Sequence, residues 1–174
     1  NYNKVGMKDA YYPGIDKFLT SKPFFKENKL LVEVDNPDYQ NFFAKLVNSK
    51  IKELDNASDG VMLDWWNDNQ PIYKGNKQTL NKARRGIAKA VREEIGLQKI
   101  ILANVNGNKD KGTVQYLNGV FFELSKSGKH KNSKELYTKS DYFMIEDLLE
   151  FYQENLQHPK LIALEGWKEG YSDS

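Results

Sequence analysis

The chain has 174 residues with 26 basic and 24 acidic side chains, a net charge of +2, and no cysteine. Nucleic-acid-binding proteins usually carry a large surplus of basic residues, which this chain does not have, so we expect no nucleic-acid partner. No run of about 18 apolar residues occurs, so we expect no membrane span. Without cysteine, disulfides, Cys-ligated metals and thiol nucleophiles are excluded.

The apolar pattern alternates between short runs, which predict strands, and longer stretches at helical spacing. Strands are predicted at residues 30–34, 60–66, 99–105, 119–124 and 161–165. Helices are predicted at about 36–54, 80–95 and 145–156, with one or two helical turns between 105 and 119. Residues 1–29 show no clear period and are expected to be an irregular segment ahead of one domain over 30–174.

This order of elements indicates an α/β fold with helical crossovers between parallel strands. We predict a parallel sheet of about five strands. Asn36 before Pro37 predicts a helix start, and Gly96 predicts a helix end. We also expect Arg84, Arg85 and Arg92 on the exposed flank of their helix, and residues 125–139 to form a lysine-rich loop.

Polar side chains follow the ends of the predicted strands, where α/β proteins bind ligands. These side chains are Asp35, Asp64, Asn104 with Asn106, Glu123, and Glu165. Alternation along a strand places Asp64 on one face with Trp66, and Glu165 on one face with Trp167. A single polar residue at a strand end means little, because any strand must end in something polar. Acids beside aromatic rings, however, suit sugar chemistry, in which carboxylates act on the glycosidic bond and flat rings stack on sugars.

Residues 59–64, with the sequence DGVMLD, resemble the D-G-V-x-L-D strand of bacterial glycoside-hydrolase-like TIM barrels, the group that contains the endo-α-1,4-polygalactosaminidases. The resemblance continues through residues 101–104 (ILAN) and 118–123 (NGVFFE), and covers about residues 30–167. It implies a partial (β/α)8 TIM-barrel-type parallel sheet of about five strands in sequential order, because a full barrel needs more chain than is present here. It also implies that Asp64 and Glu123 are the catalytic pair, with Asp64 as nucleophile and Glu123 as general acid and base. The chain departs from the family at Trp65 and Trp66, where small or polar residues are common.

We therefore expect a glycoside hydrolase that acts on a poly- or oligosaccharide by a two-carboxylate, retaining mechanism, with no cofactor and no metal. The expected substrate-binding residues are Asp35, Trp65, Trp66, Asn104, Asn106, Glu165 and Trp167. The resemblance favours a secreted or periplasmic location, although the first residues do not form a signal peptide. Two alternatives stay open: a carbohydrate-binding barrel remnant without turnover, and a metal-dependent phosphoesterase built on the same acids.

Overall fold

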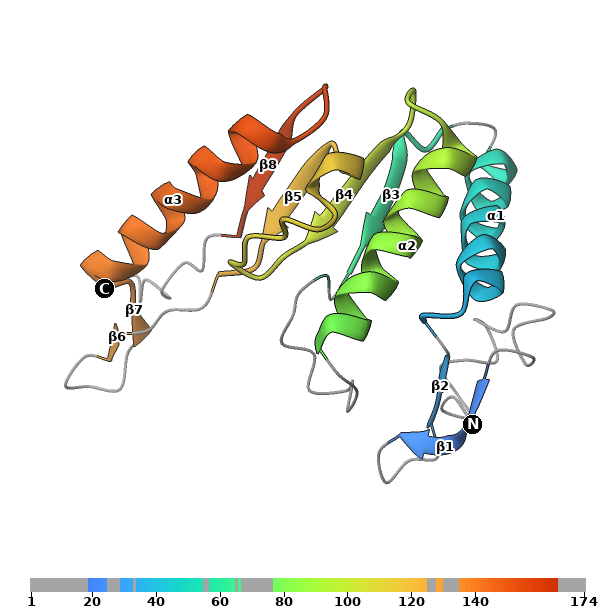
Figure 1. Ribbon diagram of the computed structural model, residues 1–174. Coiled ribbons are helices and arrows are strands. Elements are labelled where there is room, and N and C mark those ends of the chain that lie inside the picture. The colour runs from blue at the N-terminus through green and yellow to red at the C-terminus, as the bar shows by residue number, and fades with distance from the viewer. Residues whose placement is uncertain are drawn as a thin grey trace, which may run out of the picture. The chain divides into compact units, whose positions relative to one another are not determined.

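The computed structural model describes residues 19–24, 29–32, 34–54, 57–64, 66, 77–124, 128–129 and 135–165. The chain divides into two compact units, one made of residues 1–57 and 69–96 and the other of residues 58–68 and 97–174. Figure 1 labels the elements of both units. Within the described ranges, no helix is both long enough and apolar enough to cross a membrane.

The first unit begins with a two-stranded antiparallel sheet. Strand β1 (Leu19–Phe24) pairs with β2 (Lys29–Val32). The strand predicted at 30–34 was therefore assigned wrongly to the parallel sheet, and part of the segment predicted as irregular is a strand. A short apolar run does not reveal its partner, and a strand only a few residues upstream can pair with it in the antiparallel direction.

Two helices make up the rest of this unit, α1 (Pro37–Glu53) and α2 (Lys77–Ile95). As predicted, α1 begins at Asn36, whose side chain accepts a 2.9 Å hydrogen bond from the backbone of Asp38. The two helices pack side by side (Figure 1). The contact is close at Gly86, where a Cβ atom would lie 2.2 Å from the side chain of Gln40. Gly96 ends α2 with a φ of +74°, a conformation that favours glycine.

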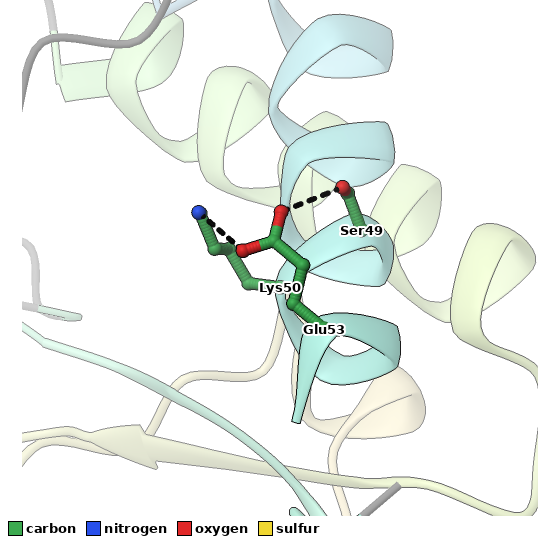
Figure 2. A network of polar contacts seen from close by, with 3 residues as sticks. All are labelled: Ser49, Lys50 and Glu53. Atoms are coloured by element: carbon green, nitrogen blue, oxygen red, sulfur yellow. Dashed lines mark hydrogen bonds and ion pairs between the residues drawn. The ribbon is translucent and has the colours of Figure 1, made fainter. Parts of the chain in front are cut away.

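The last turn of α1 carries an exposed polar network, which Figure 2 shows from close by. Glu53 accepts hydrogen bonds from Lys50 Nζ at 2.6 Å and from Ser49 Oγ at 3.2 Å. The hydrogen bond from Lys50 holds the pKa of Glu53 below its ordinary value. Because all three side chains lie at the surface, this network contributes little to the free energy of unfolding.

The arginines of α2 differ from the prediction. Arg85 is exposed as expected, but Arg84 and Arg92 are each only 6% exposed. Arg92 donates a 2.8 Å hydrogen bond from Nη1 to the carbonyl of Gly96, just beyond the helix end, and burial lowers its pKa. A long arginine side chain can cover apolar surface while its charged group satisfies a helix-terminal carbonyl, so a charged residue type does not by itself predict exposure.

The second unit is built on a four-stranded parallel sheet. Its strands are β3 (Gly60–Leu63), β4 (Ile100–Asn104), β5 (Gly119–Phe122) and β8 (Leu161–Leu164). They neighbour one another in this order, and every neighbouring pair is parallel (Figure 1). The predicted fold class is confirmed: the chain is an α/β protein with a sequentially ordered parallel sheet, as in part of a TIM barrel.

The connections between the strands of this sheet differ in length, and the one from β4 to β5 is short. A 3₁₀ turn, η2 (Val114–Tyr116), lies between β4 and β5, as predicted. Within the segment predicted as a loop, β6 (Gly128–Lys129) and β7 (Glu135–Leu136) form a small antiparallel pair. Helix α3 (Lys139–Asn155) follows, contacts β8, and begins at Thr138 with a capping box formed with Asp141.

The core of this unit lies along the two central strands. Ile101, Ala103, Val105, Val120 and Phe122 are fully buried, together with Leu117 and Tyr152. The strands approach closely at Gly60, where a Cβ atom would lie 1.9 Å from the carbonyl oxygen of Ile100. A glycine after Asp59 is therefore required for β3 to pair with β4. The register of this pairing determines which residues at the ends of the two strands lie beside each other.

Candidate active site

Three neighbouring strands of the parallel sheet end in side chains that contact one another. Asp64 follows β3, Asn104 is the last residue of β4, and Glu123 follows β5. The Nδ2 atom of Asn104 donates a 2.9 Å hydrogen bond to Oδ1 of Asp64 and another of 2.9 Å to Oε2 of Glu123. The structure therefore brings together three of the residues that the sequence predicted for the site.

The shared donor limits the distance between the two acids. Since each bonded oxygen lies 2.9 Å from the same nitrogen, the two oxygens are separated by no more than twice that distance. The two hydrogens of a planar amide diverge by about 120°, which corresponds to a separation of about 5 Å between the acceptors. Carboxyl groups about 5–5.5 Å apart are typical of retaining glycosidases, whereas inverting enzymes need a wider gap for a water molecule.

The orientation of the Asn104 amide is fixed by its surroundings. Its Oδ1 accepts a 3.3 Å hydrogen bond from the backbone N–H of Asn106, so the oxygen faces a donor while the nitrogen faces two acceptors. Asn106 has a φ of +45°, and the following Gly107 a φ of +71°. This left-handed turn carries the chain away directly after the site.

The three side chains differ in exposure. Asn104 is 3% exposed, whereas Asp64 and Glu123 are both exposed. A buried neutral amide thus holds two acids that can reach a bound molecule. A carboxylate accepts hydrogen bonds readily, and such bonds to charged groups are stronger than those between neutral groups.

Trp66 has a different place from the one predicted. Its side chain is 6% exposed, and its indole N–H donates a 2.9 Å hydrogen bond to Oγ1 of Thr113. Its backbone N–H donates to the carbonyl of Asn104 at 2.8 Å. The structure therefore corrects the expectation of an open stacking surface at Trp66: the ring belongs to the core and leaves no broad face for a sugar. Alternation along β3 predicted that Trp66 shares a face with Asp64, but Trp66 lies beyond the strand end at Leu63, where alternation no longer applies.

Glu165 follows β8 and is half-buried. Its backbone N–H donates to the carbonyl of Phe122 at 2.9 Å, which places it at the same end of the sheet as Glu123. The pKa of Tyr137 is raised, first by burial and then by the negative charge of Glu165. The ring centroids of Tyr137 and Tyr142 lie 6.0 Å apart, and Tyr142 is 58% exposed.

The other predicted site residues are Asn106, Asp35, Trp65 and Trp167. Asn106 contributes its backbone N–H to Asn104, while its side chain is exposed. Asp35 is exposed, belongs to the first unit, and directly precedes the N-cap of α1. Trp65 and Trp167 lie outside the described residues.

Two sets of residues near this edge were missed from the sequence. Tyr137 and Tyr142 flank the start of α3, and Asp110 and Thr113 lie in the connection after β4. The D-x-x-T spacing of Asp110 and Thr113 is a recognisable local hydrogen-bonding pattern that could have suggested an ordered loop. In the described part of the chain, no group of three or more His, Asp or Glu side chains is arranged to hold a metal ion.

Comparison with known proteins gives a likeness of fold. No protein-family model matches the chain, and no curated protein sequence matches it. Among solved structures, the chain is similar to the crystal structure of the chitinase domain of the spore coat protein CotE from Clostridium difficile, with 16% sequence identity and a TM-score of 0.55. The match covers 76% of this chain and 44% of that chain, so the chain spans less than half the length of its structural neighbour. At this identity the likeness shows the fold alone.

Proposed function

We propose that this chain carries the catalytic pair of a glycoside hydrolase that cleaves a poly- or oligosaccharide with retention of anomeric configuration. The observation that carries the proposal is the single Nδ2 atom of Asn104 bonded to both Asp64 and Glu123. It supports a separation of two exposed carboxyl groups that suits attack and protonation at one glycosidic bond.

In the proposed reaction, Asp64 attacks the anomeric carbon while Glu123 donates a proton to the leaving oxygen. The glycosidic bond breaks, and a glycosyl ester forms on Asp64. Glu123, now ionised, takes a proton from a water molecule that attacks the same carbon, and Asp64 leaves as a carboxylate. Glu123 regains its proton in this second step, so atoms and charges balance over the cycle.

Asn104 has a different role in this proposal from the positioning of sugar hydroxyls. Both hydrogens of its amide nitrogen are directed to the two acids, and its oxygen accepts from Asn106. A donor in this position sets the distance between the acids and keeps Asp64 oriented as the nucleophile. We therefore assign Asn104 to holding the pair rather than to holding the substrate.

The substrate is proposed from two observations. The fold is similar to a chitinase domain, which supports a sugar polymer as the class of substrate. Glu165 and the exposed ring of Tyr142 offer a carboxylate and an aromatic surface at this end of the unit, as sugar-binding sites often do. The predicted contributions of Asp35, Trp65 and Trp167 to substrate binding stay predictions.

The test is hydrolysis of a panel of polymers that includes chitin oligosaccharides and α-1,4-linked polygalactosamine, followed by release of reducing ends. We expect Asp64→Asn and Glu123→Gln each to lower kcat by about 10³-fold or more, because each removes a group that takes part in bond making or breaking. Glu165→Gln should lower it far less. Glu154→Gln, an exposed glutamate of α3, serves as the matched control.

Three results would count against the proposal. Equal losses in Glu165→Gln and Glu123→Gln would mean that the wrong acid is assigned. Binding of a sugar polymer by the wild type without any cleavage would favour a carbohydrate-binding remnant. Hydrolysis of a phosphoester that depends on added divalent metal would favour the phosphoesterase, for which the described residues supply no metal-binding group.

A further inference from the structure

A second polar cluster lies in the core beside the candidate site. The indole N–H of Trp66 donates to Oγ1 of Thr113, and the hydroxyl of Thr113 donates to Oδ2 of Asp110. All three side chains are buried, Thr113 completely. A hydroxyl has one hydrogen, so its donation to the carboxylate leaves its lone pairs to accept from the indole, and the direction of the chain of bonds is fixed.

Asp110 is itself held from several sides. Its Oδ1 accepts from the backbone N–H groups of Gly112 at 3.2 Å and Thr113 at 3.3 Å. Its own backbone N–H donates to the hydroxyl of Tyr152 at 2.9 Å, and this hydroxyl donates to the carbonyl of Asn108 at 2.5 Å. These bonds tie the connection after β4 to α3.

Trp66 links this cluster to the acids. It follows Asp64 by two residues, and its backbone N–H donates to the carbonyl of Asn104 at 2.8 Å. Its indole N–H bonds Thr113, so Trp66 is held at both its backbone and its side chain. Asp64 therefore lies between the end of β3 and an anchored residue.

We propose that Thr113 and Asp110 are positioning residues that hold Asp64 within hydrogen-bond distance of Asn104 by anchoring Trp66. The catalytic meaning of this anchor rests on the proposed function, but the anchor itself is a geometric relationship that can be measured without a substrate. Neither residue touches the reacting atoms in this proposal.

The experiment uses the side-chain amide of Asn104 as the reporter, by NMR of the whole chain. In the wild type its two N–H protons should be shifted downfield and exchange slowly with water, since both are bonded to carboxylates. Thr113→Val keeps the shape but removes the hydroxyl, and should speed exchange of this amide by about tenfold, as expected from loss of a buried hydrogen-bond anchor. Thr113→Ser restores the hydroxyl and should return exchange to within about twofold of the wild type.

Two further variants keep the test decisive. Trp66→Phe keeps an aromatic side chain and removes the smaller ring of the indole with its N–H, so it should repeat the effect of Thr113→Val even if the latter folds poorly. Thr79→Val makes the same chemical change on α2, in the first unit, and should leave the Asn104 amide unchanged. Where a sugar is hydrolysed, kcat should fall in Thr113→Val with KM little changed.

An Asn104 amide that is unaffected by both Thr113→Val and Trp66→Phe would overturn the proposal, as would failure of Thr113→Ser to restore it. An equal effect of Thr79→Val would also overturn it, because the response would then reflect general destabilisation. If no sugar is cleaved by the wild type, the proposed function fails while the amide measurement still decides whether the anchor exists.

Discussion

Asn104 donates a 2.9 Å hydrogen bond from Nδ2 to Oε2 of Glu123, across the neighbouring strands β4 and β5. The same nitrogen bonds Asp64 on the other side. A neutral donor with two hydrogens between two acids lets both carboxyl groups lie close together without facing each other directly. This arrangement depends on the amide being neutral. A substitution that introduces a charge at Asn104 should therefore disturb it most.

Asn104→Asp is expected to destabilise the fold at neutral pH by about 2–4 kcal/mol, because it places a third carboxyl among two acids in a buried position. Repulsion raises the pKa of the introduced carboxyl above its unfolded value of about 3.9. The unfolded chain then releases this proton more easily, so the loss of stability grows as pH rises and shrinks as pH falls toward 4. Urea unfolding between pH 4 and pH 7 measures this dependence.

The matched control for this change is Gln98→Glu, which introduces a carboxyl at an exposed turn. It should alter the free energy of unfolding by no more than about 0.5 kcal/mol across the same pH range. A loss of stability in Asn104→Asp that is the same at pH 4 and pH 7 would show that the introduced charge does not meet the two acids.

Gly60→Ala is expected to lower the free energy of unfolding by about 1–3 kcal/mol or more, because the added methyl group meets the Ile100 carbonyl and forces β3 away from β4. Chemical denaturation measures the loss. Gly112→Ala is the control, since its added atom would come no closer than 3.6 Å to Asp110 and its φ lies outside the left-handed region. Similar stabilities of the two variants would contradict the close pairing of β3 with β4, which positions Asp64 beside the end of β4.

Glu165→Gln should lower the pKa of Tyr137 toward its ordinary value, because a nearby negative charge disfavours the phenolate. The pKa should stay above that value, since burial is the larger cause. A titration followed by the ¹³Cζ resonance of Tyr137 measures the change, with Glu154→Gln as the control. An unchanged pKa in Glu165→Gln would place the two side chains too far apart to share a sugar-binding surface.

The meeting of Asp64, Asn104 and Glu123 could be predicted because it follows from topology. Parallel strands in sequential order bring their carboxyl ends to one edge, so polar residues at successive strand ends become neighbours. What could not be predicted is that Asn104 bonds both acids, since this depends on the turn at Asn106 and on the side-chain conformations. The helix start at Asn36 could also be predicted, but from local interactions rather than topology, because a cap is formed between residues close in sequence.

The errors have physical causes as well. The run at residues 30–34 has the composition of a buried strand, but pairing is decided by which segment lies beside it, and here that is β1. Trp66 continues the parity of β3, yet it lies past the strand end, where Thr113 offers its indole N–H a buried partner. In both places tertiary contacts decided what the local pattern left open.

The measurement that tests the central claim most directly is covalent trapping. A 2-deoxy-2-fluoro glycoside of a cleaved sugar slows the second step of a retaining enzyme, so the glycosyl ester accumulates and peptide mass spectrometry can locate it. We predict one added sugar on the peptide that contains Asp64, its loss in Asp64→Asn, and slower labelling in Glu123→Gln unless the leaving group is activated. Label on another acid, or a first-formed product of inverted configuration by NMR, would contradict the assignment of Asp64 as the nucleophile.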